Sequence, residues 1–292
     1  MKKDFNKGLL LTSLGSFWWG FIGVIYFQYV SFIGHVELVV HRCLWTAVML
    51  ILTTTFFSKW NIFLKIVANK KNLFALFVSG FLIFINWAVW IYAVATERII
   101  DASFGYFIMP ILSVLLGYIF FKEELNKKRI FSVLLVLISI LILILFNLKS
   151  LPWVGLIVAL SWAFYNLIRK KIDIDTDIGL LIESLYILPF ALVTFYFIVE
   201  SGLNDFDLSN PALSLFLILA GPMTVIPLFL YVRGVELIGL GPTGMIFYIT
   251  PTLQFILGYF YYNEEFSLIK FLSFIIIWIA VIIYLKDLYE TN

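Results

Sequence analysis

Charged residues and cysteine are scarce in this chain. Asp, Glu, Lys and Arg make up 13% of its 292 residues and hydrophobic residues 63%, whereas a soluble domain carries roughly 25% charged and 45–50% apolar residues. This composition excludes a water-soluble fold, because too much apolar surface would face water. The net charge of +2 is too small to indicate nucleic-acid binding. The single cysteine, Cys43, excludes a disulfide within the chain.

Sequence signatures of catalysis and of metal or cofactor binding are missing as well. The sequence holds no HExxH pair, no phosphate-binding loop, no GxSxG motif and no cysteine cluster. Asp173, Asp175 and Asp177 resemble the start of a calcium loop, but Ile178 stands where that loop needs glycine. We therefore expect neither an enzyme nor a bound cofactor or metal, and we expect these aspartates to cap a helix.

Long apolar runs, separated by short polar clusters, make up most of the chain. The runs are continuous rather than alternating, which indicates helices and not barrel strands. A helix needs about 20 apolar residues to cross a bilayer. We therefore predict an all-α integral membrane protein with ten transmembrane helices. These lie at residues 8–28, 36–57, 73–95, 99–121, 130–146, 152–168, 178–199, 212–232, 238–261 and 267–285.

Lysine and arginine are distributed unevenly over the predicted loops. This distribution sets the orientation, because loops rich in positive charge stay on the cytoplasmic side. With the N-terminus inside, only Arg98, Lys149 and Lys270 of the 20 basic residues fall in outer segments, and Arg42 alone lies within a span. We expect a multi-pass membrane protein with both termini in the cytoplasm.

A motif of the fourth predicted span returns in the ninth. Pro110 and Gly117 recur 141 residues later as Pro251 and Gly258, and a glutamate pair follows each copy. Five spans per half is an odd number, so the second copy would be inverted in the membrane, as is typical of secondary transporters. The sequence thus predicts two inverted five-helix repeats, residues 1–148 and 149–292.

Ionisable side chains inside the predicted spans are candidates for function, because charge is costly in a bilayer. Glu37 and His41 share one face of the second span, and Arg42 lies about 100° further around the helix. Glu183 in the seventh span aligns with His41 in the repeat, so both copies of this position can titrate. The alternatives are that Arg42 reaches the outer interface, that His41 packs in the core, and that Glu183 pairs with a nearby cation.

Neutral polar and aromatic side chains supply the remaining candidates for a substrate site. Asn86 and Gln254 lie within spans, where such groups either bind a ligand or hydrogen-bond neighbouring helices. Aromatic rings at depth either stack on a flat or cationic solute or simply pack. Those we select are Trp19, Trp90, Tyr106, Trp162, Tyr165 and Tyr248.

Several segments of the sequence together resemble the RarD family of the EamA group in the drug/metabolite transporter superfamily. They are residues 37–45 (ELVVHRCLW), 86–110, 161–165, 169–171, 226–228 and 248–255. The resemblance implies ten spans, inverted repeats and a central cavity that opens alternately to each side. Met109 and Phe247 stand where the resemblance implies an asparagine and a glutamine, which indicates a less polar pocket.

Residue patterns and resemblance together favour a secondary transporter for a small amphipathic metabolite such as an amino acid, working as exporter or exchanger and coupled to a proton. Its partners would be this small-molecule substrate, the lipid bilayer and the coupling proton. The alternatives are an intramembrane enzyme that acts on lipid and a structural or regulatory membrane subunit. A polar cavity between the halves would favour the transporter over both.

The predicted orientation can be tested with single cysteines introduced into a Cys43→Ser background. We expect Asp205→Cys to react with a membrane-impermeant maleimide in intact cells, and Lys127→Cys to react only after the membrane is opened. The reverse pattern would overturn the orientation, and labelling of both positions from one side would overturn the number of spans.

Overall fold

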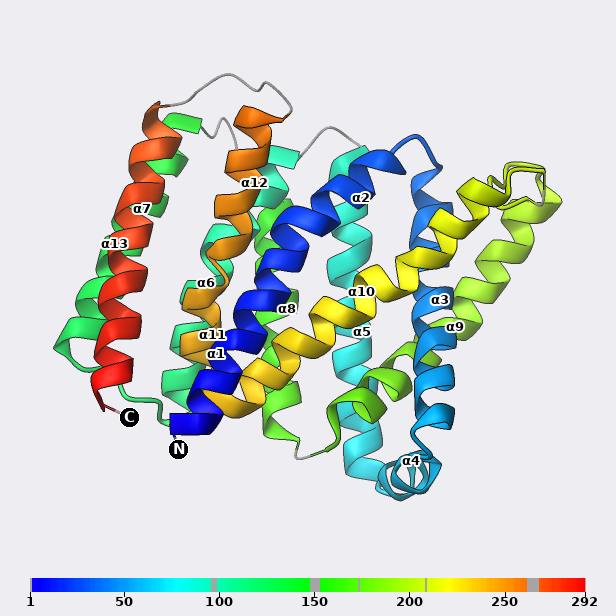
Figure 1. The fold of residues 1–292 in the computed structure, drawn as a ribbon, viewed down its shortest axis with the longest axis horizontal. Helices are drawn as coiled ribbons and strands as arrows, with labels where there is room; N and C mark the ends of the chain where they lie inside the picture. The colour runs from blue at the N-terminus through cyan, green and yellow to red at the C-terminus, as the bar shows by residue number, and fades with distance from the viewer. Residues whose placement is uncertain are drawn as a thin grey trace.

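The protein is a bundle of helices (Figure 1). The computed structural model describes residues 2–95, 99–147, 153–172, 174–207, 209–261 and 268–291, and within these ranges all regular secondary structure is helical. The apolar runs form helices because a helix satisfies its own backbone groups where water is absent. The elements are α1 (Lys2–Phe17), the π-helical turn η1 (Trp18–Ile22), α2 (Gly23–Tyr29), α3 (His35–Phe56), α4 (Trp60–Val67), α5 (Lys70–Ala95), α6 (Ile99–Phe121), α7 (Lys127–Asn147), α8 (Trp153–Lys171), α9 (Thr176–Glu200), α10 (Pro211–Ile238), α11 (Leu240–Ile246), α12 (Ile249–Phe260) and α13 (Leu268–Thr291).

Seven helical segments in the described residues are long and apolar enough to cross a membrane. They are the continuous segment Asp4–Tyr29, which joins α1, η1 and α2, and the helices α3, α5, α7, α9, α10 and α13. The other three predicted spans fall on α6, on α8 and on α11 with α12. The all-helical membrane architecture is confirmed, whereas the count of ten crossings stays a prediction. The two ends of the chain lie at the same edge of the bundle (Figure 1), as an even number of crossings requires.

Helices from the two predicted repeats are interleaved. The most extensive contacts join α1 to α10, α6 to α8 and α11, α7 to α13, α3 to α9 and α10, and α5 to α8 and α9. In each of these pairs one helix precedes residue 148 and the other follows it. Large apolar side chains such as Phe56 and Phe260, which are 82% and 75% exposed, point away from the bundle, as lipid contact requires.

The aspartates near the start of α9 bind a lysine instead of capping the helix. Lys59 Nζ lies 3.2 Å from Asp175 Oδ1 and 2.9 Å from Asp177 Oδ2, and Asp173 lies outside the described residues. Partial burial lowers the pKa of Lys59, but the two carboxylates outweigh it, so the pKa is raised. The cation therefore ties the turn after α3 to the start of α9.

Close backbone contact between α3 and α10 depends on Gly221. A Cβ atom at this position would lie 2.5 Å from the carbonyl oxygen of Trp45. Because that neighbour is backbone on a packed helix, it cannot move aside cheaply.

We predict that Gly221→Ala destabilises the folded protein by about 1–3 kcal/mol, as overpacking of a close contact does. Gly34→Ala is the matched control, because nothing lies within 4 Å of a Cβ at that position. Melting temperatures in the same detergent measure both. A Gly221→Ala protein that melts with or above the Gly34→Ala protein would contradict the close contact.

Candidate functional site

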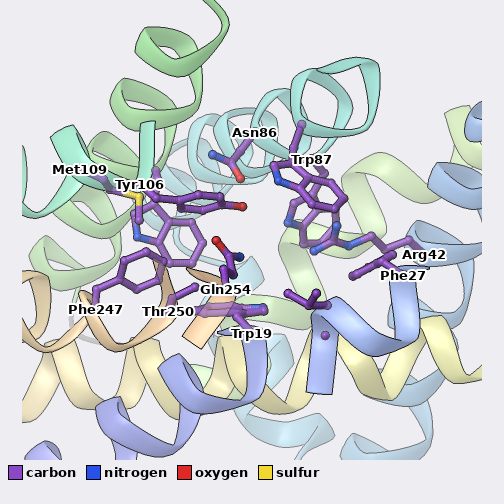
Figure 2. A pocket seen from close by; sticks show the side chains of 14 residues that line it. Trp19, Phe27, Arg42, Asn86, Trp87, Tyr106, Met109, Phe247, Thr250 and Gln254 are labelled. Carbon is purple, nitrogen blue, oxygen red and sulfur yellow. The ribbon is translucent and has the colours of Figure 1, made fainter. Parts of the chain in front are cut away.

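A cavity of about 80 Å³ lies among helices of both predicted repeats (Figure 2). A single water needs roughly 10–15 Å³ of such space, so the cavity has room for a small organic molecule. Its walls come from η1, α2, α3, α5, α6, α8, α12 and the turn between α11 and α12. The lining residues are Trp19, Gly23, Val24, Phe27, Arg42, Asn86, Trp87, Trp90, Tyr106, Met109, Trp162, Phe247, Thr250 and Gln254.

The π-helical turn η1 places Trp19 on the cavity wall. The turn spans Trp18–Ile22, and such turns inside α-helices occur frequently at functional sites. It lies against α12 at Gly20, where an added Cβ would come within 2.9 Å of the Thr250 carbonyl oxygen. A side chain at position 20 would push Trp19 and Thr250 apart.

Proline produces the break between α11 and α12 that directs Phe247 toward the cavity. Pro251 has no backbone N–H to donate to the carbonyl of Phe247, four residues before it. That carbonyl accepts the N–H of Thr250 at 2.9 Å instead, and the chain turns at Phe247 and Tyr248. On α6, Tyr106 has the same relation to Pro110, and its ring lies 6.0 Å from that of Phe247.

Arg42 is the charged residue of the cavity wall. Its side chain points inward from α3 (Figure 2) and is only 7% exposed. Nε donates to Thr224 Oγ1 at 3.0 Å, and the guanidinium carbon lies 4.5 Å from the centre of the Trp87 ring and 5.2 Å from that of Phe27. These contacts hold the guanidinium plane while leaving its terminal nitrogens directed at the cavity.

Neutral polar groups face the arginine across the cavity. Asn86 donates its amide to the Val158 carbonyl at 2.8 Å and to Ser161 Oγ at 3.1 Å. This fixes the side chain so that its oxygen points into the cavity, toward the Tyr106 hydroxyl and the Gln254 amide (Figure 2). The three groups can donate and accept hydrogen bonds, but none carries charge.

Aromatic rings form the apolar side of the cavity. Trp19 and Trp162 meet edge to face at 5.2 Å between ring centres. Phe247 lies 6.1 Å from Trp19 and 6.2 Å from Trp162. These separations are in the range of attractive aromatic pairs, so this side of the cavity is a packed cluster of tilted rings that offers apolar and aromatic contacts to a ligand.

The structure brings seven of the eleven sequence-predicted site residues to this cavity: Arg42, Trp19, Asn86, Trp90, Tyr106, Trp162 and Gln254. Sequence reasoning did not select Phe27, Trp87 or Thr224. For Trp87 a signal existed, because it stands three residues before Trp90 and so shares its helix face.

His41 lies away from the cavity and is engaged on both ring nitrogens. The Trp45 indole, which can only donate, donates to Nδ1 at 3.1 Å, while Nε2 faces Glu37 Oε1 at 3.4 Å. This pattern fixes a neutral ring with its hydrogen on Nε2. Glu37 also accepts the backbone N–H groups of Asp205 and Phe206, so the group joins α3 to the loop before α10.

Glu183, Tyr165 and Tyr248 are likewise buried outside the cavity. Glu183 accepts from Ser79 Oγ at 2.5 Å and from the Tyr165 hydroxyl at 3.3 Å, and Arg169 Nη1 lies 3.6 Å from it. Tyr248 donates to the Phe107 carbonyl at 2.8 Å. For Glu183 the sequence left open either a functional role or pairing with a nearby cation. The contact with Arg169 is the pairing that the second alternative describes.

A carboxylate at the cytoplasmic side, by the predicted orientation, holds the element that carries Phe247. Glu123 follows α6, and its two oxygens accept the N–H groups of Leu240 and Gly241, each at 2.8 Å. Lys170 Nζ completes the group at 2.8 Å. Since α11 begins at Leu240 and ends just before Phe247, Glu123 fixes the position of that cavity wall.

The helices are long and apolar enough to cross a membrane. They pack around a cavity whose described wall holds one cation, neutral polar groups and aromatic rings. These features define the class of the protein, which is a multi-pass membrane protein with a solute-sized site. The chain belongs to the EamA-like transporter family, whose profile matches residues 6–145 and 150–286.

Proteins of similar sequence align with nearly the whole chain. Protein RarD of Escherichia coli (strain K12) is 32% identical over 290 residues, which is 99% of this chain and 97% of that protein. An uncharacterized transporter of Vibrio cholerae serotype O1 is 33% identical over 287 residues, covering 98% and 94%. The resemblance to RarD proteins is thereby confirmed. A solved crystal structure of a protein 13% identical has a TM-score of 0.71 and covers 95% of this chain and 96% of its own, which shows a shared fold.

The contacts of Glu123 predict a specific loss in the Glu123→Gln protein. A glutamine has one acceptor oxygen instead of two and no charge, so one of the two backbone N–H groups would face an NH₂ group and the ion pair with Lys170 would be lost. Charge-assisted hydrogen bonds are worth about 1.5–3 kcal/mol. We expect a lower melting temperature and faster hydrogen exchange at Leu240 and Gly241. The neighbouring Glu124→Gln, which changes an exposed side chain, is the control. Equal exchange in both variants would remove Glu123 from this role.

Proposed function

We propose that the protein is a secondary transporter of the bacterial inner membrane that exports or exchanges a small amphipathic metabolite, such as an amino acid, by alternating access. The observation that carries this proposal is the cavity itself, because helices of both halves surround it and its walls combine Arg42 and neutral polar groups with aromatic rings. Substrate sites of such transporters lie near the middle of the membrane between the repeats.

We further propose ten spans arranged as two inverted repeats, residues 1–148 and 149–292, with both termini in the cytoplasm. Two separate matches of the family profile, to residues 6–145 and 150–286, support this division. Residues at equivalent positions of the two halves also meet at the cavity. Trp19 lies against Trp162, and Tyr106 lies against Phe247.

The cavity supports a transporter better than the two alternatives. An enzyme acting on lipid needs a nucleophile or a general base at the site. In the described part of the wall no histidine, cysteine or carboxylate is present, and His41 is held neutral away from it. A structural subunit has no need of a solute-sized cavity with a buried cation.

For energy coupling, we propose that Glu183 rather than His41 carries the proton. Protonating His41 would leave Nδ1 without a lone pair for the Trp45 indole. Glu183 faces Ser79, Tyr165 and Arg169, and a carboxylate can exchange its pairing with an arginine for a proton. A second cavity of about 10 Å³, the size of one water, is lined by Glu183 and by Trp87, and Trp87 also lines the substrate cavity.

Proteoliposomes loaded with a bacterial metabolite extract test both transport and coupling. We expect the wild-type protein to release at least one metabolite, and to release it faster when the outside is made more acidic. Glu183→Gln should retain equilibrium exchange of that metabolite and lose the response to the gradient, while Glu200→Gln, on an exposed position of the same helix, keeps it. Mass spectrometry of the released solutes provides the measurement.

Absence of any release that depends on the protein would refute transport. A wild-type protein that releases solute independently of pH, or a Glu183→Gln protein that responds like wild type, would leave transport standing and favour a uniporter or a sodium-linked mechanism.

A further inference from the structure

We infer that the cavity recognises a small monocarboxylate with an apolar ring, whose anionic group binds Arg42 and whose ring packs against the aromatic residues of the wall. This inference rests on the proposed function and narrows its substrate class to monocarboxylates without an ammonium group, so the amino acid given there as an example is excluded. It follows from the charges that surround the cavity and from those that are missing there.

The positive charge of Arg42 has no counter-ion among the residues that the structure describes. Among the described residues no carboxylate lies within salt-bridge distance of it, and its only hydrogen bond runs from Nε to the Thr224 hydroxyl. The two Nη groups donate to no described residue, although the side chain is only 7% exposed. A buried charge without a partner is costly, and these N–H groups form a fork that matches the two oxygens of a carboxylate.

The buried carboxylates on elements packed against α3 are engaged elsewhere. Glu37, on the same helix, accepts the backbone N–H groups of Asp205 and Phe206. Glu183, on α9, is held by Ser79 Oγ and faces Arg169. Neither group can neutralise Arg42 without giving up these partners, so no described carboxylate is available to it and a ligand can supply the negative charge.

The described lining does not favour a cationic ligand. It contains no aspartate or glutamate, so an ammonium there would lie near the positive charge of Arg42 without a carboxylate to pair with. One cation–π surface, the Trp87 ring, is already used by the guanidinium, whose carbon lies 4.5 Å from the ring centre. Asn86, Tyr106 and Gln254 are neutral and serve an uncharged polar substituent instead.

The aromatic lining favours an apolar ring in the ligand. Trp19, Trp162 and Phe247 form one cluster with ring centres 5.2–6.2 Å apart and mutual tilts of 41–80°, and edges and faces presented at such angles attract a further aromatic ring. Met109 and Phe247 are apolar at wall positions. A volume of about 80 Å³ suits a single ring better than a peptide or a lipid.

Three planar molecules of similar shape test this inference: benzoate, benzamide and benzamidine, which carry negative, zero and positive charge. Calorimetric titration of the protein in lipid nanodiscs, in chloride-free buffer, gives their affinities. We expect benzoate to bind at least tenfold more tightly than benzamide, which corresponds to about 1.4 kcal/mol, and benzamidine to show no binding. Chloride is titrated separately, as the inorganic source of the same charge.

Substitutions of Arg42 test whether its guanidinium group is the source of the preference for a negatively charged ligand. Arg42→Gln should remove the advantage of benzoate over benzamide, and Arg42→Lys should retain part of it. Arg233→Gln, at a half-exposed arginine paired with Glu236, should behave as wild type. Because the wild-type comparison alone decides the sign of the charge, an Arg42→Gln protein that fails to fold leaves the inference testable.

Each contrary result has a defined meaning. Benzamidine binding as well as benzoate, no binding of any of the three, or benzoate binding that a folded Arg42→Gln protein retains would overturn the inference. Chloride binding without benzoate would assign the site to inorganic anions. Benzoate that binds but is not taken up into proteoliposomes would count against transport alone, whereas transport of another solute without benzoate binding would count against the inference alone.

Discussion

The structure depends on one constraint: within a bilayer every backbone N–H and carbonyl has to find its partner inside the protein. Departures from α-helix are therefore found where other protein groups can form hydrogen bonds with the freed backbone N–H and carbonyl groups. The π-helical turn at Trp18–Ile22 and the break at Phe247 and Tyr248 lie next to each other at the centre of the bundle, on facing elements. The irregular backbone that would be intolerable against lipid here produces a cavity.

The same constraint governs charge. Most buried charges in the described residues are paired within the protein, as Arg129 is with Asp287 and Arg169 with Glu183. Glu37 is satisfied by backbone N–H groups rather than by a cation. Arg42 differs, because aromatic faces and one hydroxyl surround it. Such partners hold the guanidinium in place without cancelling its charge, so within the described part of the cavity wall it is the one charge still available to a ligand.

The all-helical membrane architecture was predictable because the length of an apolar run acts locally along the chain, whereas the orientation inferred from Lys and Arg stays a prediction. Polar residues at depth, such as Asn86 and Gln254, were also correct guides to the cavity lining. The titratable residues His41 and Glu183 lie outside the cavity. Burial forces such a group to find a partner, and the sequence does not reveal whether that partner is a ligand or a protein residue such as Trp45 or Arg169. Phe27 and Thr224 were missed because the rotation of each helix about its axis is set by packing.

The interleaving of the helices has a consequence for how the protein is made. During synthesis α1 enters the membrane long before α10, and α7 before α13, although each packs mainly against that later partner. The hydrogen bond from Arg42 to Thr224 likewise cannot form until α10 has been inserted. Until the last third of the chain has been inserted, the early helices have to be sheltered by lipid, by each other or by the insertion machinery. The bundle is thus completed late in synthesis. A ribosome that stalls after α9 would leave a fragment in which polar residues of the early helices lack the later helices that bury them.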